Sequence, residues 1–434
     1  MGTICPSILG ILQIALVLMT PQQWREDLRF AAREMERAHK NLYHSISREQ
    51  FAAMVNTLDA EIPSLARHRI IVEMAKIAAA VGDGHTNLAP TRDPKIGFHT
   101  LPIALYFFED GLFIRAAHKS QASLVGARIV RIGNATVEDA YKAVRTMISR
   151  DNEQGVRYWA PQFLVMPEVL HALGLIDDIE VVPVTIERDG KREVVTLRAL
   201  GPAEMMPPDT DMTWSRRADW IDARGDNDPL WLRDAKSPAR MEVLPGTKTL
   251  YVQLNQISDD LKQFSETMRR RIVADDVDRL ILDLRLNRGG HGDYNVFLVR
   301  AVIQSQSIDQ DGRFFCLIGR ATFSAAQSLA DQLEKYTNVT FVGEPSGSKG
   351  NAFGDSRKII LPNSGITVRA SVFYWQEWFP LDKREATEPK IAAPLTFDAY
   401  RKNIDPALAV ISSAPPSSSE RASTARSRSA PSGY

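Results

Sequence analysis

Three loops of the sequence pair small residues with groups that could take part in catalysis. Gly289 and Gly290 follow an apolar run in "LDLRLNRGGHGDYN", and paired glycines let backbone N–H groups approach a ligand, as an oxyanion hole requires. Ser324 lies in "IGRATFSAAQSLA", at a predicted strand-to-helix junction where the amide of Ala325 and the helix dipole would favour an attacking serine. Lys349 stands alone in the small-residue loop "FVGEPSGSKGNAFG", and a buried lysine can act as a general base for a serine.

Each loop also has a simpler interpretation that involves no catalysis. The glycine pair could form an ordinary tight turn, and the order Ser324-Ala-Ala-Gln327 fits a capping box, which on its own favours a helix cap over a nucleophile. The lysine loop partly matches a phosphate-binding loop, because Gly343 is followed after four residues by Ser348 and the lysine. That motif requires Gly before the lysine and Ser or Thr after it, so the phosphate interpretation is disfavoured.

The elements that must position these loops are alternating strands and helices. From Thr247 onward, apolar strand patterns such as "TLYVQLN", "RLILDLRL", "FFCLIG" and "VTFVGE" alternate with helical patterns such as "LKQFSETMRRRIV" and "AAQSLADQLEKY". This alternation predicts an α/β layer with a largely parallel sheet. Active sites in such sheets lie at the carboxyl ends of the strands, which is where the three loops are expected.

The rest of the chain divides by its hydrophobic period. Residues 21–92 carry helical patterns and end in the glycine-containing "AAAVGDGHTNLAP", which predicts a small helical domain. Residues 97–200 contain short strand patterns and one helical piece, which predicts a small β-rich module. Residues 201–245 are rich in Pro, Asp, Arg and Trp and are interpreted as a connecting segment. Its tryptophans are expected to cover neighbouring surfaces rather than to form a ligand cage: Trp214, Trp220 and Trp231.

Both ends of the chain differ in composition from the part between them. Residues 1–20 carry an uncharged apolar run from Ile4 to Met19, which is short for a bilayer span and suits the core of a signal peptide. This pattern favours export, periplasmic or extracellular, whereas a cytoplasmic location follows if the segment is not a signal. Residues 412–434 form a tail rich in Ser, Pro and Arg, which predicts disorder.

Charge and cysteine content narrow the class of partner. Lys plus Arg and Asp plus Glu number 53 each, so the chain has no excess positive charge with which to hold a nucleic acid. The two cysteines, Cys5 and Cys316, exclude a disulfide framework. No pair of His or Cys residues has the spacing of zinc ligands, so a zinc site is not expected. The sequence leaves the oligomeric state open.

Several motifs together resemble a known family. "LILDLRLNRGG", "RATFSAAQ" and "VGEPSGSKGN" are similar to successive core motifs of the tail-specific, or C-terminal processing, serine peptidases and their interphotoreceptor-retinoid-binding-protein-like relatives. In the processing proteases the serine and the lysine are 25 positions apart, as Ser324 and Lys349 are here. The segments "DGHT", "LPNSGITV" and "NIDPALAVI" also resemble the family, so the resemblance covers most of the chain.

The resemblance implies a fold, an activity and a set of site residues. The fold would be α/β, with a crotonase-like (ClpP/crotonase-type) protease core over residues 246–411, an N-terminal helical domain and a PDZ-like module. The activity would be that of a serine-type endopeptidase that cleaves extended polypeptides with no metal or cofactor. Ser324 would attack the peptide carbonyl and Lys349 would take its proton. The oxyanion would be held by backbone N–H groups of Gly289 or Gly290 and of Ala325.

Some positions depart from the family pattern. Bacterial processing proteases often carry Gln four residues after the lysine, where this chain has Phe353, so Asn351 is the candidate to orient the lysine. Arg288 stands where a small residue or Pro is commoner, and it is a candidate to narrow the site or to bind a substrate carboxylate. The predicted PDZ-like module lacks a clear carboxylate-binding glycine loop, which leaves the recognition of free C-termini open.

Two histidines near these motifs are interpreted differently. His291 follows the glycine pair and is a candidate for contact with the substrate. His85 could form a pair with Ser324, but the resemblance gives the role of base to Lys349. His85 is therefore interpreted as structural, ordering the end of the helical domain.

Two other classes of function compete with the peptidase. The resemblance includes retinoid-binding relatives, and the missing Gln after Lys349 is compatible with a protein that binds apolar ligands or peptides without cutting them. An acyl-CoA enzyme of the related crotonase fold would explain the glycine loop but not the spacing of Ser324 and Lys349.

Overall fold

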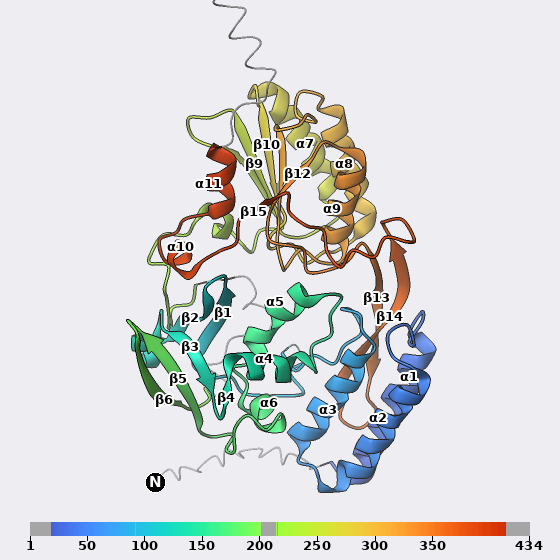
Figure 1. Ribbon diagram of the computed structural model, residues 1–434. Helices are drawn as coiled ribbons and strands as arrows, with labels where there is room; N and C mark the ends of the chain where they lie inside the picture. The colour runs from blue at the N-terminus through green and yellow to red at the C-terminus, as the bar shows by residue number, and fades with distance from the viewer. Residues whose placement is uncertain (1–18, 92, 201–213, 215, 414–434) are drawn as a thin grey trace, which may run out of the picture.

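The computed structural model describes residues 19–91, 93–200, 214 and 216–413 (Figure 1). Over these residues the protein is a mixed α/β structure with two large sheets and a separate two-stranded sheet. Residues 1–18 of the predicted leader and residues 414–434 of the predicted tail lie outside the described residues.

Three helices open the described chain, as the helical period of residues 21–92 predicts. They are α1 (Pro21–Ala38), α2 (Arg48–Glu61) and α3 (Arg67–Ala80), with the short 3-10 helix η1 (Ile62–Ser64) before α3. Thr20 and Ser47 begin α1 and α2 with capping boxes, and each box satisfies two backbone donors at a helix start. No helix among the described residues is both long and apolar enough to cross a bilayer.

A seven-stranded antiparallel sheet follows in the chain. Its strands lie in the order β1-β2-β3-β5-β6, with β4 paired to β3 and β7 to β2. The strands before the connecting segment are β1 (Ile103–Phe108), β2 (Gly111–His118), β3 (Arg128–Ile132), β4 (Ala135–Thr136), β5 (Val182–Arg188) and β6 (Lys191–Leu197). The helices between them are η2 (Lys119–Leu124), α4 (Val137–Arg145), α5 (Glu153–Phe163) and α6 (Pro167–Ala172).

The segment predicted to be only a connection, residues 201–245, supplies a strand to each large sheet. Its described elements are β7 (Trp220–Asp222), η4 (Leu230–Leu232) and β8 (Ala239–Val243). β7 pairs with β2 and β8 pairs with β9. Trp214 and Trp231 are buried and pack edge to face, with ring centroids 5.4 Å apart.

The six-stranded sheet contains the predicted alternation of strands and helices. Its order is β15-β12-β11-β10-β9-β8, and all neighbours are parallel except β8 and β9. The remaining strands of this sheet are β9 (Thr249–Leu254), β10 (Arg279–Asp283), β11 (Phe314–Ile318), β12 (Thr340–Gly343) and β15 (Ile391–Ala392). The helices are α7 (Leu261–Ala274), η5 (Gly292–Tyr294), α8 (Asn295–Gln304), α9 (Ala325–Tyr336), α10 (Phe397–Arg401) and α11 (Pro406–Ser413).

Helices cover both faces of this sheet. α7, α8 and α9 lie on one side and α11 on the other (Figure 1). Along β10, Leu280 and Leu282 belong to the core beneath α7 to α9, whereas Ile281 packs with Ala407 and Ile411 of α11. Successive strand side chains point to opposite faces, so a parallel sheet covered on both faces needs the continuous apolar runs seen in the sequence.

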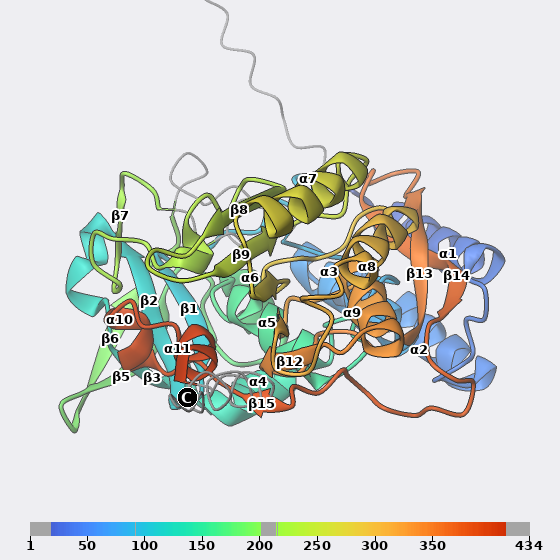
Figure 2. The same ribbon diagram turned by 90° about the horizontal axis from the view of Figure 1, so that it is seen from above.

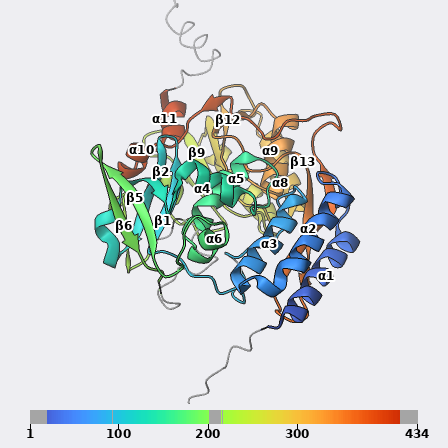
Figure 3. The ribbon, with the colours of Figure 1, turned by 60° about the horizontal axis from the view of Figure 1, so that its bottom comes forward.

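A long hairpin links the C-terminal part of the chain to the N-terminal helices. β13 (Asn351–Ile360) and β14 (Thr367–Gln376) pair only with each other as strands, and they lie beside α1 (Figure 2, Figure 3). Asp27 of α1 is fully buried and accepts hydrogen bonds from the backbone N–H groups of Asn363 and Ser364, each at 2.9 Å. Segments from the predicted helical domain and the predicted protease core are therefore packed together.

Candidate active site

Ser324 lies in the turn between β11 and α9, at the carboxyl end of a central strand. Its backbone has φ 57° and ψ −128°, a conformation that costs free energy in a residue with a side chain and that recurs at functional turns. The Ser324 side chain makes no capping hydrogen bond to α9. The capping-box interpretation of Ser324 is therefore wrong, and the residue sits in a strained strand-to-helix turn like those that expose a nucleophile.

Gln327, the other half of the expected capping box, has different partners. Its Nε2 donates to Oδ1 of Asp331 at 2.7 Å and to Oγ1 of Thr387 at 2.8 Å. Burial raises the pKa of Asp331 to about 7, although the hydrogen bonds from Thr387 and Gln327 act against this rise. These contacts fix α9 to the segment before β15, so the Gln327 side chain bonds Asp331 and Thr387 instead of the backbone N–H of Ser324 that a capping box requires.

His85 lies in a tight turn that a buried carboxylate organises. Asp83 is 2% exposed, and its Oδ1 accepts hydrogen bonds from the backbone N–H groups of His85 (2.9 Å) and Thr86 (2.7 Å). The same oxygen accepts from Oγ of Ser371 in β14 at 2.7 Å, and Nε2 of His39 lies 2.9 Å from Oδ2. Burial raises the pKa of Asp83, but the hydrogen bonds from His39 and Ser371 outweigh this effect and lower it to about 2.

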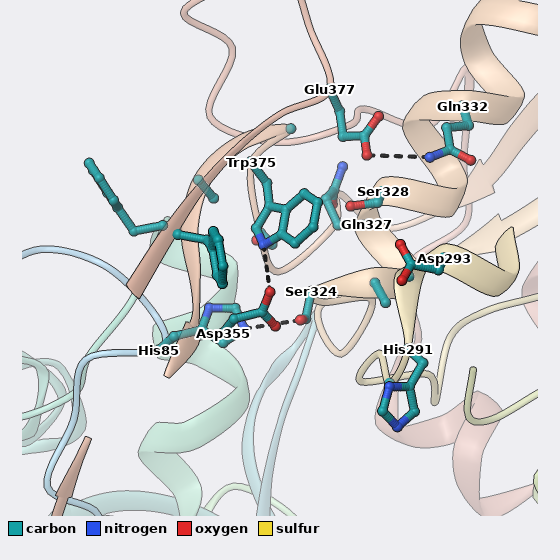
Figure 4. Close-up of a pocket in the computed structure, with 18 of the residues that line it drawn as sticks. His85, His291, Asp293, Ser324, Gln327, Ser328, Gln332, Asp355, Trp375 and Glu377 are labelled. Carbon is teal, nitrogen blue, oxygen red and sulfur yellow. Dashed lines mark hydrogen bonds between the residues drawn. The ribbon is translucent and has the colours of Figure 1, made fainter. Parts of the chain in front are cut away.

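The fold brings His85 to Ser324 although 239 positions separate them in the chain. Nε2 of His85 lies 3.0 Å from Oγ of Ser324, and both residues line a cavity of about 460 Å³ (Figure 4). The ring of Phe323 stacks on the imidazole, with centroids 4.6 Å apart, and so restricts its orientation. The interpretation of His85 as only structural is therefore wrong, because the histidine contacts the candidate nucleophile.

Lys349 lines the same cavity but has another partner. Its Nζ donates to Oε2 of Glu385 at 3.3 Å, and 30% of its side chain is exposed. Among the described residues, the hydrogen bond of the Ser324 hydroxyl is made with His85 and not with Lys349.

The glycine loop next to Ser324 offers fewer amides than the sequence predicts. The N–H of Gly289 donates to Oδ1 of the fully buried Asn287 at 2.8 Å, so it is already used. The N–H groups of Gly290 and Ala325 have no acceptor among the described residues. Ala325 is the first residue of α9, where backbone donors have no partner within the helix. Gly290 and Ala325 are thus the amides left to hold an oxyanion.

A buried carboxylate that the motifs did not indicate, Asp151, lies next to the histidine turn. It is 5% exposed, its Oδ1 accepts from the N–H of Gly84 at 2.8 Å, and its Oδ2 accepts from Oγ of Ser348. Burial raises the pKa of Asp151, while the nearby His85 acts in the opposite direction. Nδ1 of His85 is buried with no hydrogen-bond partner among the described residues. Asp151 lies in the loop between α4 and α5, where no spacing or composition signal marks it.

The three other predicted site residues, Asn351, His291 and Arg288, lie in different surroundings. Asn351 holds a backbone loop, since its Nδ2 donates to the carbonyl of Phe379 and its Oδ1 accepts from the N–H of Trp378, each at 3.0 Å. His291 lines the cavity with Ser324, as predicted for a substrate contact (Figure 4). Arg288 lines a second cavity on the other side of His85. Within the described ranges, no group of three or more His, Cys, Asp or Glu residues could hold a metal ion.

Comparisons with known proteins agree with the resemblance in the motifs. Residues 248–378, which include Ser324 and Lys349, match the family model of Peptidase family S41. This part of the chain is therefore similar to the serine peptidases of family S41, as the motifs predict. No curated protein matches the chain.

Solved structures are similar to this chain over most of its length. Mature CPAF complexed with lactacystin is similar with a TM-score of 0.59 and 13% identity, over 90% of this chain and 97% of that one. A second structure of mature CPAF gives 0.58 and 12%, over 90% and 96% of the two chains. The photosystem II D1 C-terminal processing protease gives 0.41 and 15%, over 85% and 92%. At these identities the CPAF structures show that the fold is shared.

Proposed function

We propose that this chain is a serine endopeptidase in which Ser324 is the nucleophile and His85 is its general base. The observation that carries the proposal is the 3.0 Å contact between Oγ of Ser324 and Nε2 of His85. It is supported by the strained backbone of Ser324 at the start of α9. The match to family S41 supports the serine peptidase class, and the contact between Ser324 and His85 favours His85 over Lys349 as the base.

The reaction would proceed through an acyl-enzyme. Oγ of Ser324 attacks the peptide carbonyl carbon while its proton passes to Nε2 of His85. The N–H groups of Gly290 and Ala325 donate to the oxygen that becomes negative. The imidazolium then gives its proton to the leaving amine, and the ester is hydrolysed by water that His85 deprotonates, which restores the serine. No metal or cofactor enters this proposal.

Asp151 is proposed to support the histidine electrostatically. An imidazole that accepts a proton at Nε2 must carry the other proton at Nδ1, and a nearby carboxylate stabilises the resulting imidazolium. Asp151 binds the N–H of Gly84, the residue before His85. It therefore acts as a positioning residue for the histidine turn.

The proposal also assigns a domain type to each of the two large sheets. The six-stranded sheet with α7 to α9 is proposed to be a crotonase-like protease core, because strands and helices alternate in it. The seven-stranded sheet with α4 is proposed to be the PDZ-like module, because it is formed mainly by residues 97–200. Extended polypeptides are the proposed substrates, since aromatic side chains of β14 line the cavity beside Ser324, namely Phe373 and Trp375. Export of the protein is proposed from the apolar run of residues 1–20.

Lys349 remains the rival base, because it lines the same cavity as Ser324 and has the family's spacing from it. The test compares Ser324→Ala, His85→Ala and Lys349→Ala, with Lys358→Ala as an exposed control on β13. Fluorophosphonate labelling with peptide mapping and cleavage of an unfolded protein are measured for each variant. We expect no labelling in Ser324→Ala and a loss of at least about 100-fold in His85→Ala, with a smaller loss in Lys349→Ala.

The outcomes separate the three hypotheses. Full activity of His85→Ala together with inactivity of Lys349→Ala would establish the Ser-Lys dyad instead. Wild-type protein that neither reacts with the fluorophosphonate nor cleaves any polypeptide, but binds a fatty acid or retinoid tightly, would favour the non-catalytic binding protein.

A further inference from the structure

A second cavity lies beside the catalytic pair and is separate from the cavity that contains Ser324. Its volume is about 290 Å³. Elements from all parts of the fold contribute to it: the histidine turn, the segment after α4, α5, the glycine loop and the β13–β14 hairpin. His85 lines both cavities, whereas Ser324 lines only the first. A polypeptide held for attack by Ser324 would therefore reach this second cavity with a group near the scissile bond.

Apolar and neutral polar side chains line this cavity, and apart from His85 its described acidic or basic residues are arginines only. Apolar side chains that line it are Leu88, Met147, Ile148, Trp159, Phe163 and Phe323. The charged groups are the guanidinium groups of Arg288 and Arg369, and none of the described residues that line it is Asp or Glu. The first cavity has the opposite balance, because Asp293, Asp355 and Glu377 line it together with a single lysine.

Arg288 is held in the cavity wall by aromatic rings rather than by a carboxylate. Its guanidinium carbon lies 4.1 Å from the ring centre of Trp159 and 5.0 Å from that of Tyr158. Its Nε is buried with no hydrogen-bond partner among the described residues, and burial lowers its pKa. The guanidinium forms a hydrogen bond with the Tyr158 side chain, but no described carboxylate pairs with it. A buried cation without an anion is costly, and an incoming carboxylate would supply that anion.

Arg369 approaches the same cavity from β14. The backbone of Arg369 exchanges hydrogen bonds with Asn87, two residues after His85, at 3.1 and 2.8 Å. The position of the arginine is thereby fixed relative to the histidine turn. Its side chain forms no ion pair with a carboxylate of the described chain. Two guanidinium groups on apolar walls are the donors that a carboxylate prefers.

We propose that this second cavity is a substrate subsite that binds a carboxylate of the polypeptide close to the scissile bond. The inference rests on the proposed peptidase function and adds a specificity to it. The carboxylate has two sources in a polypeptide, an acidic side chain or the free C-terminus. The same pair of arginines would recognise either, so the experiment separates them.

The test uses matched peptides. Cleavage sites are first mapped in an unfolded protein, and peptides are then made with Glu or Gln at each of three positions on either side of the cut, or with a C-terminal carboxylate or amide. We expect the carboxylate form to raise kcat/KM by about tenfold at one position, as a charged hydrogen bond would. A preference at an internal position identifies an acidic side chain, and a preference for the free C-terminus identifies the chain end.

Variants connect this preference to the cavity. The ratio of kcat/KM for the two members of a pair should fall towards one in Arg288→Gln and in Arg369→Gln. It should persist in Arg357→Gln, which removes an exposed arginine of β13 outside the cavity. If the stacked Arg288 is needed for folding, as thermal unfolding would reveal, Arg369→Gln alone carries the test. A wild-type enzyme with no preference for any carboxylate, or a preference retained in Arg369→Gln, would overturn the proposal.

Binding to Ser324→Ala separates failure of the subsite from failure of the peptidase function. Fluorescent heptapeptide libraries with a central Glu or Gln, and with a free or amidated C-terminus, are titrated against Ser324→Ala with and without Arg369→Gln. Tighter binding of a carboxylate form that depends on Arg369 supports the subsite even where wild-type protein cuts nothing. Equal binding of all forms overturns the subsite while leaving the peptidase function intact.

Discussion

Ser324 acquires its role from a backbone conformation that no residue pattern encodes. Its sequence context, Ser-Ala-Ala-Gln, is that of a helix cap, yet the residue has φ 57° and its hydroxyl is directed to His85. A capping serine has an extended backbone and binds the amide of the third helical residue. The local sequence therefore does not predict the backbone conformation that the structure shows at Ser324.

The glycine loop makes close contact with this turn, which leads to a prediction for Gly289→Ala. A Cβ on Gly289, where φ is 103°, would lie 2.8 Å from Cβ of Ser324 and 2.9 Å from the backbone nitrogen of Ala325. We expect the nucleophile and the oxyanion amide to be displaced, with a loss of at least about 100-fold in kcat. Steady-state kinetics and the rate of fluorophosphonate labelling measure this loss. Gly190→Ala is the control, because a Cβ there meets nothing within 4 Å and φ is also positive.

A Gly289→Ala variant with full kcat would show that the glycine loop is not part of the catalytic site. A loss of activity of the same size in Gly190→Ala would trace the effect to backbone strain elsewhere. Thermal unfolding of both variants separates the two explanations.

At the scale of residues, the sequence predicted the candidate nucleophile and the loops around it, whereas the hydrogen bond of the Ser324 hydroxyl is made with His85 and not with Lys349. Ser324, Gly290 and Ala325 lie together as the motifs predict, because all follow strands of one parallel sheet. His85 and Asp151 come from other parts of the chain, and their approach depends on how those parts pack. The proposal that His85 is the base therefore needed the structure.

At the scale of elements, the turn of residues 83–86 is the part of the site most dependent on one charge. The Asp83 carboxylate accepts hydrogen bonds from backbone N–H groups of the turn. Its pKa is lowered to about 2 from an ordinary value of 3.8. A carboxyl with a depressed pKa in the folded state contributes stability that is complete above 3.8 and is lost as the pH falls from 3.8 towards 2. A depression of this size corresponds to about 2 kcal/mol.

Replacing Asp83 by Asn should therefore lower the free energy of unfolding by about 2 kcal/mol at pH 7. The difference from wild type should shrink as the pH falls from 3.8 towards 2, because the wild-type carboxyl becomes neutral as well. Urea unfolding of both proteins from pH 2 to pH 7 measures this. Asp311→Asn is the control at an exposed position. A difference that stays constant over this range would contradict the assigned role of the Asp83 charge.

Strands with long apolar runs were predictable, while the shortest ones were not. β10 and β11 are apolar on both faces because helices cover both sides of the sheet. β7 has only three residues, and its pairing with β2 depends on the partner strand rather than on its own pattern. The connecting segment was therefore expected to lack strands, although it adds one to each large sheet.

At the scale of the whole molecule, the β13–β14 hairpin joins the two halves of the site. Its strand β14 bonds to Asp83 through Ser371 and to Asn87 through Arg369, and its turn bonds to Asp27 on α1. The helical domain and the protease core predicted from the sequence are thus tied through one hairpin. Neither strand of the hairpin was predicted from the sequence, and no residue pattern indicates which helix the hairpin packs against.

The buried Asp27 should be important for this connection. Asp27→Ala leaves the backbone N–H groups of Asn363 and Ser364 without their acceptor, so we expect a loss of about 2 kcal/mol in the free energy of unfolding. Hydrogen exchange should rise at residues 361–366, and labelling of Ser324 should slow because β14 supports the histidine turn. Asp59→Ala on α2, which removes more exposed ion pairs, should cost less than about 1 kcal/mol. Unchanged exchange in the turn of Asp27→Ala would show that the hairpin is held by other contacts.

The 239 positions between His85 and Ser324 also affect the order in which the site can form during synthesis. The ribosome synthesises His85 early. Ser324, and then the hairpin that supports the histidine turn, are synthesised only after most of the protein. The proposed pair of His85 and Ser324 therefore cannot form during the first part of synthesis, and Asp83 lacks its hydrogen bond from Ser371 until β14 has been made. The proposed peptidase would thus be inactive towards other unfinished chains, and towards its own earlier segments, until synthesis is almost complete.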